Sequence, residues 1–233
     1  MDKPRRIQSI DALRGFSLLL MVAYHFFYDL VYFLDAPSWI FSNPAFDVLQ
    51  PIFGGVFIAL SGVSSRFSRS NVKRGIKCLL VSLMVTVVTW FMRNPVYFGI
   101  LHLLGTAMIL YGLTEKIWDK LPSKTAPVLY AVLTAGTALL RAALNPVQQG
   151  GFWVFGFYTA TFFSSDYFPI LPWIFVFLFG TWLGALIRDG KLPDWVYTFD
   201  PPFFPALGRY SLLIYVVHQP VLYGLTMLLQ RLL

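Results

Sequence analysis

The sequence predicts an all-α, polytopic membrane protein with about seven transmembrane helices in one bundle. Of its 233 residues, 57% are hydrophobic and only 12% are charged. A soluble domain of this length carries much more polar sequence. The apolar residues also form segments of roughly 17–25 residues, the length that a helix needs to cross a bilayer. We therefore expect a single transmembrane domain over residues 1–233, with the lipid bilayer as its main partner.

Seven apolar segments are candidate spans, and short polar links separate them. The first segment is expected to be retained, because its apolar run continues past Leu30 without the small-residue cleavage site of a signal peptide. The second is short, begins at Pro51 and carries glycines such as Gly62, which allow helices to approach closely in membranes. The last contains Pro220, which weakens the local hydrogen-bond ladder. The predicted spans are 9–34, 51–65, 75–92, 98–115, 126–144, 169–187 and 207–229.

The net charge of +7 is concentrated in the links between these segments. With the N-terminus inside, the inner segments hold fifteen of the eighteen Lys and Arg residues. This asymmetry predicts a cytoplasmic N-terminus and an outer C-terminus, and it argues against a nucleic-acid partner. The aromatic stretch Gly151 to Phe163 is short for a span and is expected at the outer interface or as a re-entrant segment. If it did span, the last two helices would reverse.

Arg14 and His25 lie on one face of the first segment. Eleven helical residues at about 100° each return to within roughly 20° of the start, and they cover roughly 16 Å along the axis. A fixed cation and a titratable imidazole thus share one stripe of a helix expected in lipid. Ionisable groups at membrane depth usually face a protein interior or a water-filled cavity, so both are candidate functional residues.

Two acidic residues accompany this pair. Asp11 precedes Arg14 by three residues, which permits an ion pair that anchors the helix. Arg14 held in this way can still present donors to a phosphate. Asp29 follows His25 by four residues, so it is either an orienting partner that fixes the His25 tautomer or a hydrated interface residue.

The other two histidines also lie in or near the membrane. His102 begins the fourth span, and His218 lies in the last span beside Gln219. The side chains of His102, His218 and Gln219 are candidate hydrogen-bond donors to a developing oxyanion. No His-x-x-x-His or Glu-rich spacing accompanies them, so no metal site is predicted. The single Cys78 also excludes an intrachain disulfide and a cysteine-based metal site.

A basic cluster follows the second span, and it includes Arg66 and Arg74. Its simplest role is to set topology and to contact lipid headgroups. The same positive rim would also attract a phosphate-bearing donor, so Arg66 and Arg74 are candidate donor-binding residues together with Arg14 and Arg209. The Asp166–Pro169 stretch is expected to cap the sixth span, or to hold an acceptor.

Several of these residues resemble a known family. Ser9-Ile10-Asp11-Ala12-Leu13-Arg14-Gly15 followed by His25 looks like the opening of membrane-bound acyltransferases with an Arg-x10-His motif. Residues 57–62 resemble the second-helix signature of the same proteins, and residues 208–212 with 218–220 resemble their closing helix. Within that superfamily, the chain is most similar to bacterial relatives of the catalytic membrane domain of heparan-α-glucosaminide N-acetyltransferase.

The resemblance implies transfer of an acyl group, usually acetyl, from cytoplasmic acyl-CoA to a hydroxyl or amine of a sugar or envelope glycoconjugate. Acyl-CoA would be a co-substrate, with no permanently bound cofactor, and the location would be a bacterial inner membrane. Arg14 and His25 match the motif pair, with His25 as general base. The lysosomal member instead has an Asn near the His25 position and its catalytic His in the following loop; here residues 34–39 contain no histidine. Its large lumenal domain also has no counterpart, so heparan itself is not the expected acceptor.

Two other classes remain open at this stage. A small bundle with intramembrane His and Arg could transport or flip a lipid-linked sugar or anion, although no two-fold sequence repeat accompanies it. A noncatalytic role in envelope assembly is the other alternative. The acceptor, the acyl chain length, a direct or acyl-enzyme route, and the oligomeric state, a homodimer included, are likewise open.

Overall fold

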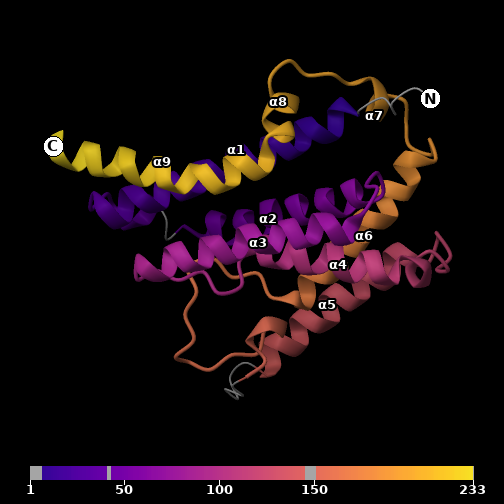
Figure 1. The fold of residues 1–233 in the computed structure, drawn as a ribbon, viewed down its shortest axis with the longest axis horizontal. Coiled ribbons are helices and arrows are strands. Elements are labelled where there is room, and N and C mark those ends of the chain that lie inside the picture. Colours follow the sequence, from indigo (N-terminus) through magenta and orange to yellow (C-terminus); the bar gives the residue numbers. More distant parts are fainter. Residues whose placement is uncertain (1–6, 41–42, 145–150, 233) are drawn as a thin grey trace. The chain divides into compact units, whose positions relative to one another are not determined.

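The computed structural model describes residues 7–40, 43–144 and 151–232, and its regular elements are helices (Figure 1). Seven of these helices are long and apolar enough to cross a membrane, which confirms the predicted fold class. They are α1 (Gln8–Phe33), α2 (Pro44–Ser65), α3 (Asn71–Phe91), α4 (Ile100–Trp118), α5 (Ala126–Leu144), α6 (Ile170–Arg188) and α9 (Ser211–Leu232). The short elements are η1 (Ser38–Ile40), η3 (Trp153–Phe155), α7 (Trp195–Thr198) and α8 (Phe204–Arg209).

Two helix boundaries differ from the sequence prediction. Helix α2 begins at Pro44, so Pro51 lies inside it and does not start it. A proline about two turns into the helix removes only one backbone bond, and the longer helix is long enough to span. The predicted last span is divided at Tyr210 into the short helix α8 and the long helix α9.

The chain forms two compact units by its internal contacts, one of residues 1–57 with 192–233 and one of residues 58–191. The first unit contains α1, α7, α8, α9 and the beginning of α2. The second contains the end of α2 and the helices α3 to α6. Whether residues 1–233 behave as a single domain stays a prediction.

In the first unit, α1 lies alongside α8 and α9, seen as the indigo and yellow helices of Figure 1. Residue numbers increase in the same direction along both helices: His25 of α1 contacts His218 of α9, and Phe33, further along α1, contacts Tyr223, further along α9. The two helices are therefore parallel. A first and a seventh span must cross in the same direction, so this packing agrees with seven spans. Residues 151–163 contain only the turn η3 and are not an additional span. Which side is cytoplasmic stays a prediction.

In the second unit, helices approach one another at glycine. A Cβ at Gly62 of α2 would lie 2.1 Å from the carbonyl oxygen of Phe177 of α6, and one at Gly180 would lie 2.0 Å from that of Ala59. Such contacts require the absence of a side chain. Helices α3 and α4 also meet closely at Gly75 and Gly105.

The segment before α6 folds back over the start of α4. The Asp166 carboxylate accepts a hydrogen bond of 3.0 Å from the backbone N–H of Ile100. Asp166 therefore caps α4. The last residue of the 166–169 stretch, Pro169, is the N-cap residue of α6, so the stretch precedes the sixth span as expected, and its role in holding an acceptor stays a prediction. Tyr167 lies in the same segment, and burial raises the pKa of its hydroxyl to about 12.

Candidate active site

Helix α1 carries the predicted pair on one continuous helix. Since Gln8–Phe33 is helical throughout, Arg14 and His25 are separated by roughly 16 Å along its axis, as expected. The stripe that holds them faces the other helices of the first unit. A Cβ at Gly15 would overlap the backbone of α8, and His25 lies against α9.

His25 and His218 form a histidine pair between α1 and α9. Their ring centroids are 5.0 Å apart, and the ring of Tyr24 meets His25 edge-on at 5.6 Å. The Nδ1 atom of His218 lies 2.6 Å from the carbonyl oxygen of Tyr215. A carbonyl can only accept, so Nδ1 carries a proton, and Nε2 is the basic nitrogen of the neutral His218 ring.

Asp29 is fully buried one turn after His25. Its two carboxylate oxygens accept from the Nε2 amide of Gln219, at 3.0 and 3.1 Å. The sequence offered two roles for Asp29, an orienting partner of His25 or a hydrated interface residue. Its full burial contradicts the second role, and its observed hydrogen bonds join α1 to α9. The amide donor of Gln219 is therefore engaged with Asp29 and is not available to an oxyanion in this arrangement.

The other end of the α1 stripe carries the cations. Arg14 forms the predicted ion pair with Asp11, with Nη1 and Oδ1 2.5 Å apart. Here α8 crosses α1 very closely, because a Cβ at Gly208 would lie 1.9 Å from the backbone oxygen of Asp11. Arg209 follows Gly208 at the exposed end of α8. The crossing therefore brings two of the candidate donor-binding residues to the same end of the first unit.

His102 belongs to the second unit. Its Nε2 lies 3.1 Å from Oγ1 of Thr86, and its ring stacks on Phe98 at 5.7 Å. The Thr86 hydroxyl donates to the carbonyl of Val96 at 2.6 Å, so it accepts from His102 Nε2–H. This bonding ties the start of α4 to α3 and gives His102 a packing role.

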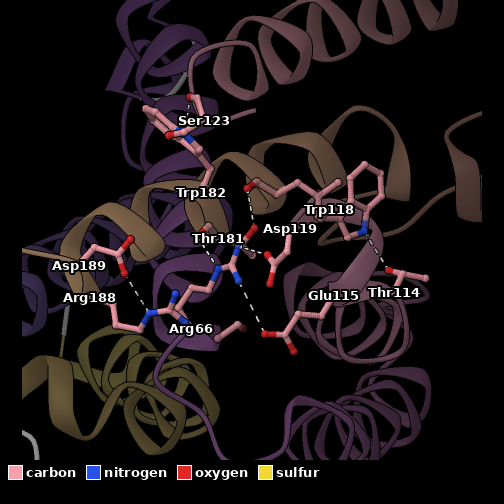
Figure 2. A network of polar contacts seen from close by, with 12 residues as sticks. Arg66, Thr114, Glu115, Trp118, Asp119, Ser123, Thr181, Trp182, Arg188 and Asp189 are labelled. Carbon is pink, nitrogen blue, oxygen red and sulfur yellow. Dashed lines mark hydrogen bonds and ion pairs between the residues drawn. The ribbon is translucent and has the colours of Figure 1, made fainter. Parts of the chain in front are cut away.

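Arg66 is the centre of a polar network in the second unit (Figure 2). Its guanidinium contacts Asp119 at 2.5 Å and Glu115 at 3.7 Å, while Nε donates to the carbonyl of Thr181 at 2.9 Å. Burial opposes the charge, but the hydrogen bond to Asp119 and the two carboxylates outweigh it and raise the pKa of Arg66. The ring of Tyr111 also lies 5.5 Å from the guanidinium carbon.

A donor phosphate would therefore have to compete with two carboxylates for Arg66. Arg74 is more accessible: it is exposed at the start of α3, and Nη1 donates to the carbonyl of Ser64 at 3.3 Å. The partners of Arg66, Glu115 and Asp119, were not predicted from the sequence. Glu115 lies in the last turn of α4 and Asp119 is its C-cap residue, four positions later, and that spacing was the available signal.

Comparison with known proteins gives one clear result. A family model described as "Heparan-alpha-glucosaminide N-acetyltransferase, catalytic" matches residues 6–220, nearly the whole chain. No curated protein and no solved structure shows a significant match to the chain. The family match confirms the resemblance drawn from the Arg14 and His25 motif.

Proposed function

Because the chain belongs to the heparan-α-glucosaminide N-acetyltransferase catalytic family, whose members are membrane acetyltransferases that use acetyl-CoA, we propose that it transfers an acetyl group from cytoplasmic acetyl-CoA. The acceptor is a hydroxyl or amine of a sugar or envelope glycoconjugate. His25 acts as general base, and the cytoplasmic side of an inner membrane supplies the donor.

The observation that carries this proposal is the histidine pair. A neutral imidazole at membrane depth can take a proton from an acceptor O–H or N–H as that atom attacks the thioester carbonyl. The carbon–sulfur bond then breaks, and the CoA thiolate leaves and takes up the proton. The neutral His218 ring, 5.0 Å from His25, stabilises the imidazolium that forms between these steps.

The donor end is the cationic end of the same unit. Arg14 presents a planar fork of donors that suits a phosphate, and Arg209 adds charge beside it. The extended pantetheine arm then carries the thioester along α1 towards His25, over the roughly 16 Å that separates the two residues.

The direct test is transfer by the detergent-purified protein, with labelled acetyl-CoA and a panel of sugar acceptors. His25→Ala should reduce turnover by about 10²–10⁴, the usual contribution of a general base, while acetyl-CoA binding persists. His102→Ala should cost less, because His102 is engaged with Thr86. Near-normal turnover in His25→Ala would contradict the assignment, and a dead His102 variant beside it would move the base to α4.

The acceptor can be sought separately in cells. Mass spectrometry of envelope glycans and lipids from wild-type and deletion strains should show one acetyl group lost in the deletion. Absence of both transfer and acetyl-CoA hydrolysis by the purified protein, together with unchanged acetylation, would favour transport or assembly instead.

A further inference from the structure

The contact between α1 and α9 contains a carboxyl group without a cation. Asp29 is 0% exposed, and its hydrogen-bond partner in the described part of the chain is the Gln219 amide. No Lys or Arg of the described residues forms an ion pair with it. An ionised carboxylate held in this way is costly, because burial removes its water and a single neutral donor replaces little of it.

Gln219, in turn, has a buried oxygen that lacks a hydrogen-bond donor: its Oε1 atom accepts no hydrogen bond from the described residues. A buried carbonyl oxygen without a donor also costs free energy, and such groups are rare in folded proteins. The two side chains in contact therefore lack, between them, one hydrogen-bond donor.

One proton supplies that donor. A protonated carboxyl has an O–H that can donate to Gln219 Oε1, while Gln219 Nε2–H donates to the other carboxyl oxygen. The two side chains then form a ring closed by two hydrogen bonds. Both the uncompensated charge and the unsatisfied carbonyl disappear, and the change needs only a small rotation of the two planar groups.

The groups around Asp29 do not offer a fixed positive charge in place of the proton. On α1 the titratable neighbours within one turn are His25, Tyr28 and Tyr32, and on α9 they are Tyr215, His218 and Tyr223. The start of α2 packs against α1 through Phe46, and its charged residue there is Asp47, an acid. Helices α7 and α8 meet α1 near Ser9 and Gly15, about 30 and 20 Å respectively along the axis from Asp29. The element η1 carries no ionisable side chain.

We propose that Asp29 is held protonated as a carboxyl–carboxamide pair with Gln219, and that this pair is a proton site in the α1–α9 contact. It lies one turn from His25 and next to His218, so its proton is bound beside the histidine pair. The inference does not depend on acetyl transfer and would hold if the protein had another activity.

Infrared spectroscopy of the detergent-purified full-length protein tests the protonation directly. The spectrum at neutral pH should contain a carbonyl stretch of a protonated carboxyl, which shifts in heavy water and is absent in Asp29→Asn. The matched control is Asp47→Asn, which changes an exposed aspartate near the start of α2 and should retain the band. If Asp29→Asn instead removes a carboxylate band, Asp29 is ionised and the proposal is wrong.

Thermal unfolding provides a second readout that does not use activity. In Asp29→Asn the new amide can donate to Gln219 Oε1 as the carboxyl O–H does, so the unfolding temperature should stay near that of the wild type. Asp29→Leu cannot make either bond and should unfold at a lower temperature. Equal destabilisation by the Asn and Leu substitutions would overturn the paired geometry. If the Leu variant fails to fold, the infrared comparison of Asp29→Asn with Asp47→Asn still decides the protonation.

Discussion

Replacing Arg66 with methionine should destabilise the second unit and leave donor binding nearly unchanged. The guanidinium side chain is 7% exposed and contacts Asp119 and Glu115, with a further hydrogen bond to the carbonyl of Thr181 (Figure 2). Methionine keeps an unbranched apolar chain of similar length, so the substitution removes mainly the charge and its donors. The change separates a structural role from the donor-binding role that the sequence suggested.

The size of the destabilisation by Arg66→Met depends on how exposed the partners of Arg66 are. The two carboxylate side chains are 43% exposed, so both regain water when Arg66 is lost, and each pairing contributes about 0.2–1 kcal/mol as in exposed ion pairs. The buried hydrogen bond from the charged Nε–H to Thr181 contributes about 1.5–3 kcal/mol. The total loss in free energy of unfolding is therefore about 2–5 kcal/mol.

The assay is thermal unfolding of the detergent-purified protein, with acetyl-CoA affinity measured on the same samples. Arg69→Met is the matched control, because Arg69 is exposed in the same link and its loss changes the net charge equally. We expect a clear fall in unfolding temperature for Arg66→Met alone. If both variants unfold like the wild type and only Arg66→Met loses acetyl-CoA affinity, the structural reasoning is refuted and Arg66 binds the donor.

Three further predictions concern packing, donor binding and topology. Gly62→Ala should lower the free energy of unfolding by about 1–3 kcal/mol, because its Cβ would overlap the backbone of α6. The control Gly136→Ala, with nothing within 4 Å of the new Cβ, should unfold like the wild type in the same thermal assay. Equal effects of the two substitutions would contradict the close helix contact. Arg14→Lys should weaken acetyl-CoA binding more than folding, since lysine keeps the charge and loses the planar fork; unchanged affinity would leave Arg14 only its ion pair. Reporters fused after Arg188 and at the C-terminus should read inside and outside respectively, and an outer Arg188 would reverse the proposed orientation.

The sequence was sufficient for the features that depend on local periodicity. Seven apolar segments predicted seven helices, and the eleven-residue spacing placed Arg14 and His25 on one stripe. The Asp11–Arg14 ion pair likewise followed from a three-residue spacing within one helix. Each of these depends on the geometry of a single helix, which is constant enough for a sequence to determine.

Contacts between helices distant in sequence could not be obtained in the same way. His25 and His218, like Asp29 and Gln219, are about 190 positions apart, and no spacing rule relates them. From its own helix alone, Asp29 could be either an orienting partner of His25 or a hydrated interface residue, whereas it is fully buried and its hydrogen bonds are made to α9. The start of α2 differs for another reason: proline favours the first turn of a helix, so Pro51 indicated a helix start, but it is tolerated here inside the helix.

The parallel packing of α1 and α9 gives the first unit a polarity that supports the proposed chemistry. Both helical segments carry a cation before an imidazole in chain order: Arg14 precedes His25, and Arg209 precedes His218. Since α8 crosses α1 beside Asp11 and the two histidines meet further along, parallel packing brings the cations to one end and the imidazoles towards the other. Antiparallel packing would have separated each like pair. A donor with charged phosphates and a distant reactive thioester requires such an arrangement, with charge recognition at one end and proton transfer well removed along the same helix.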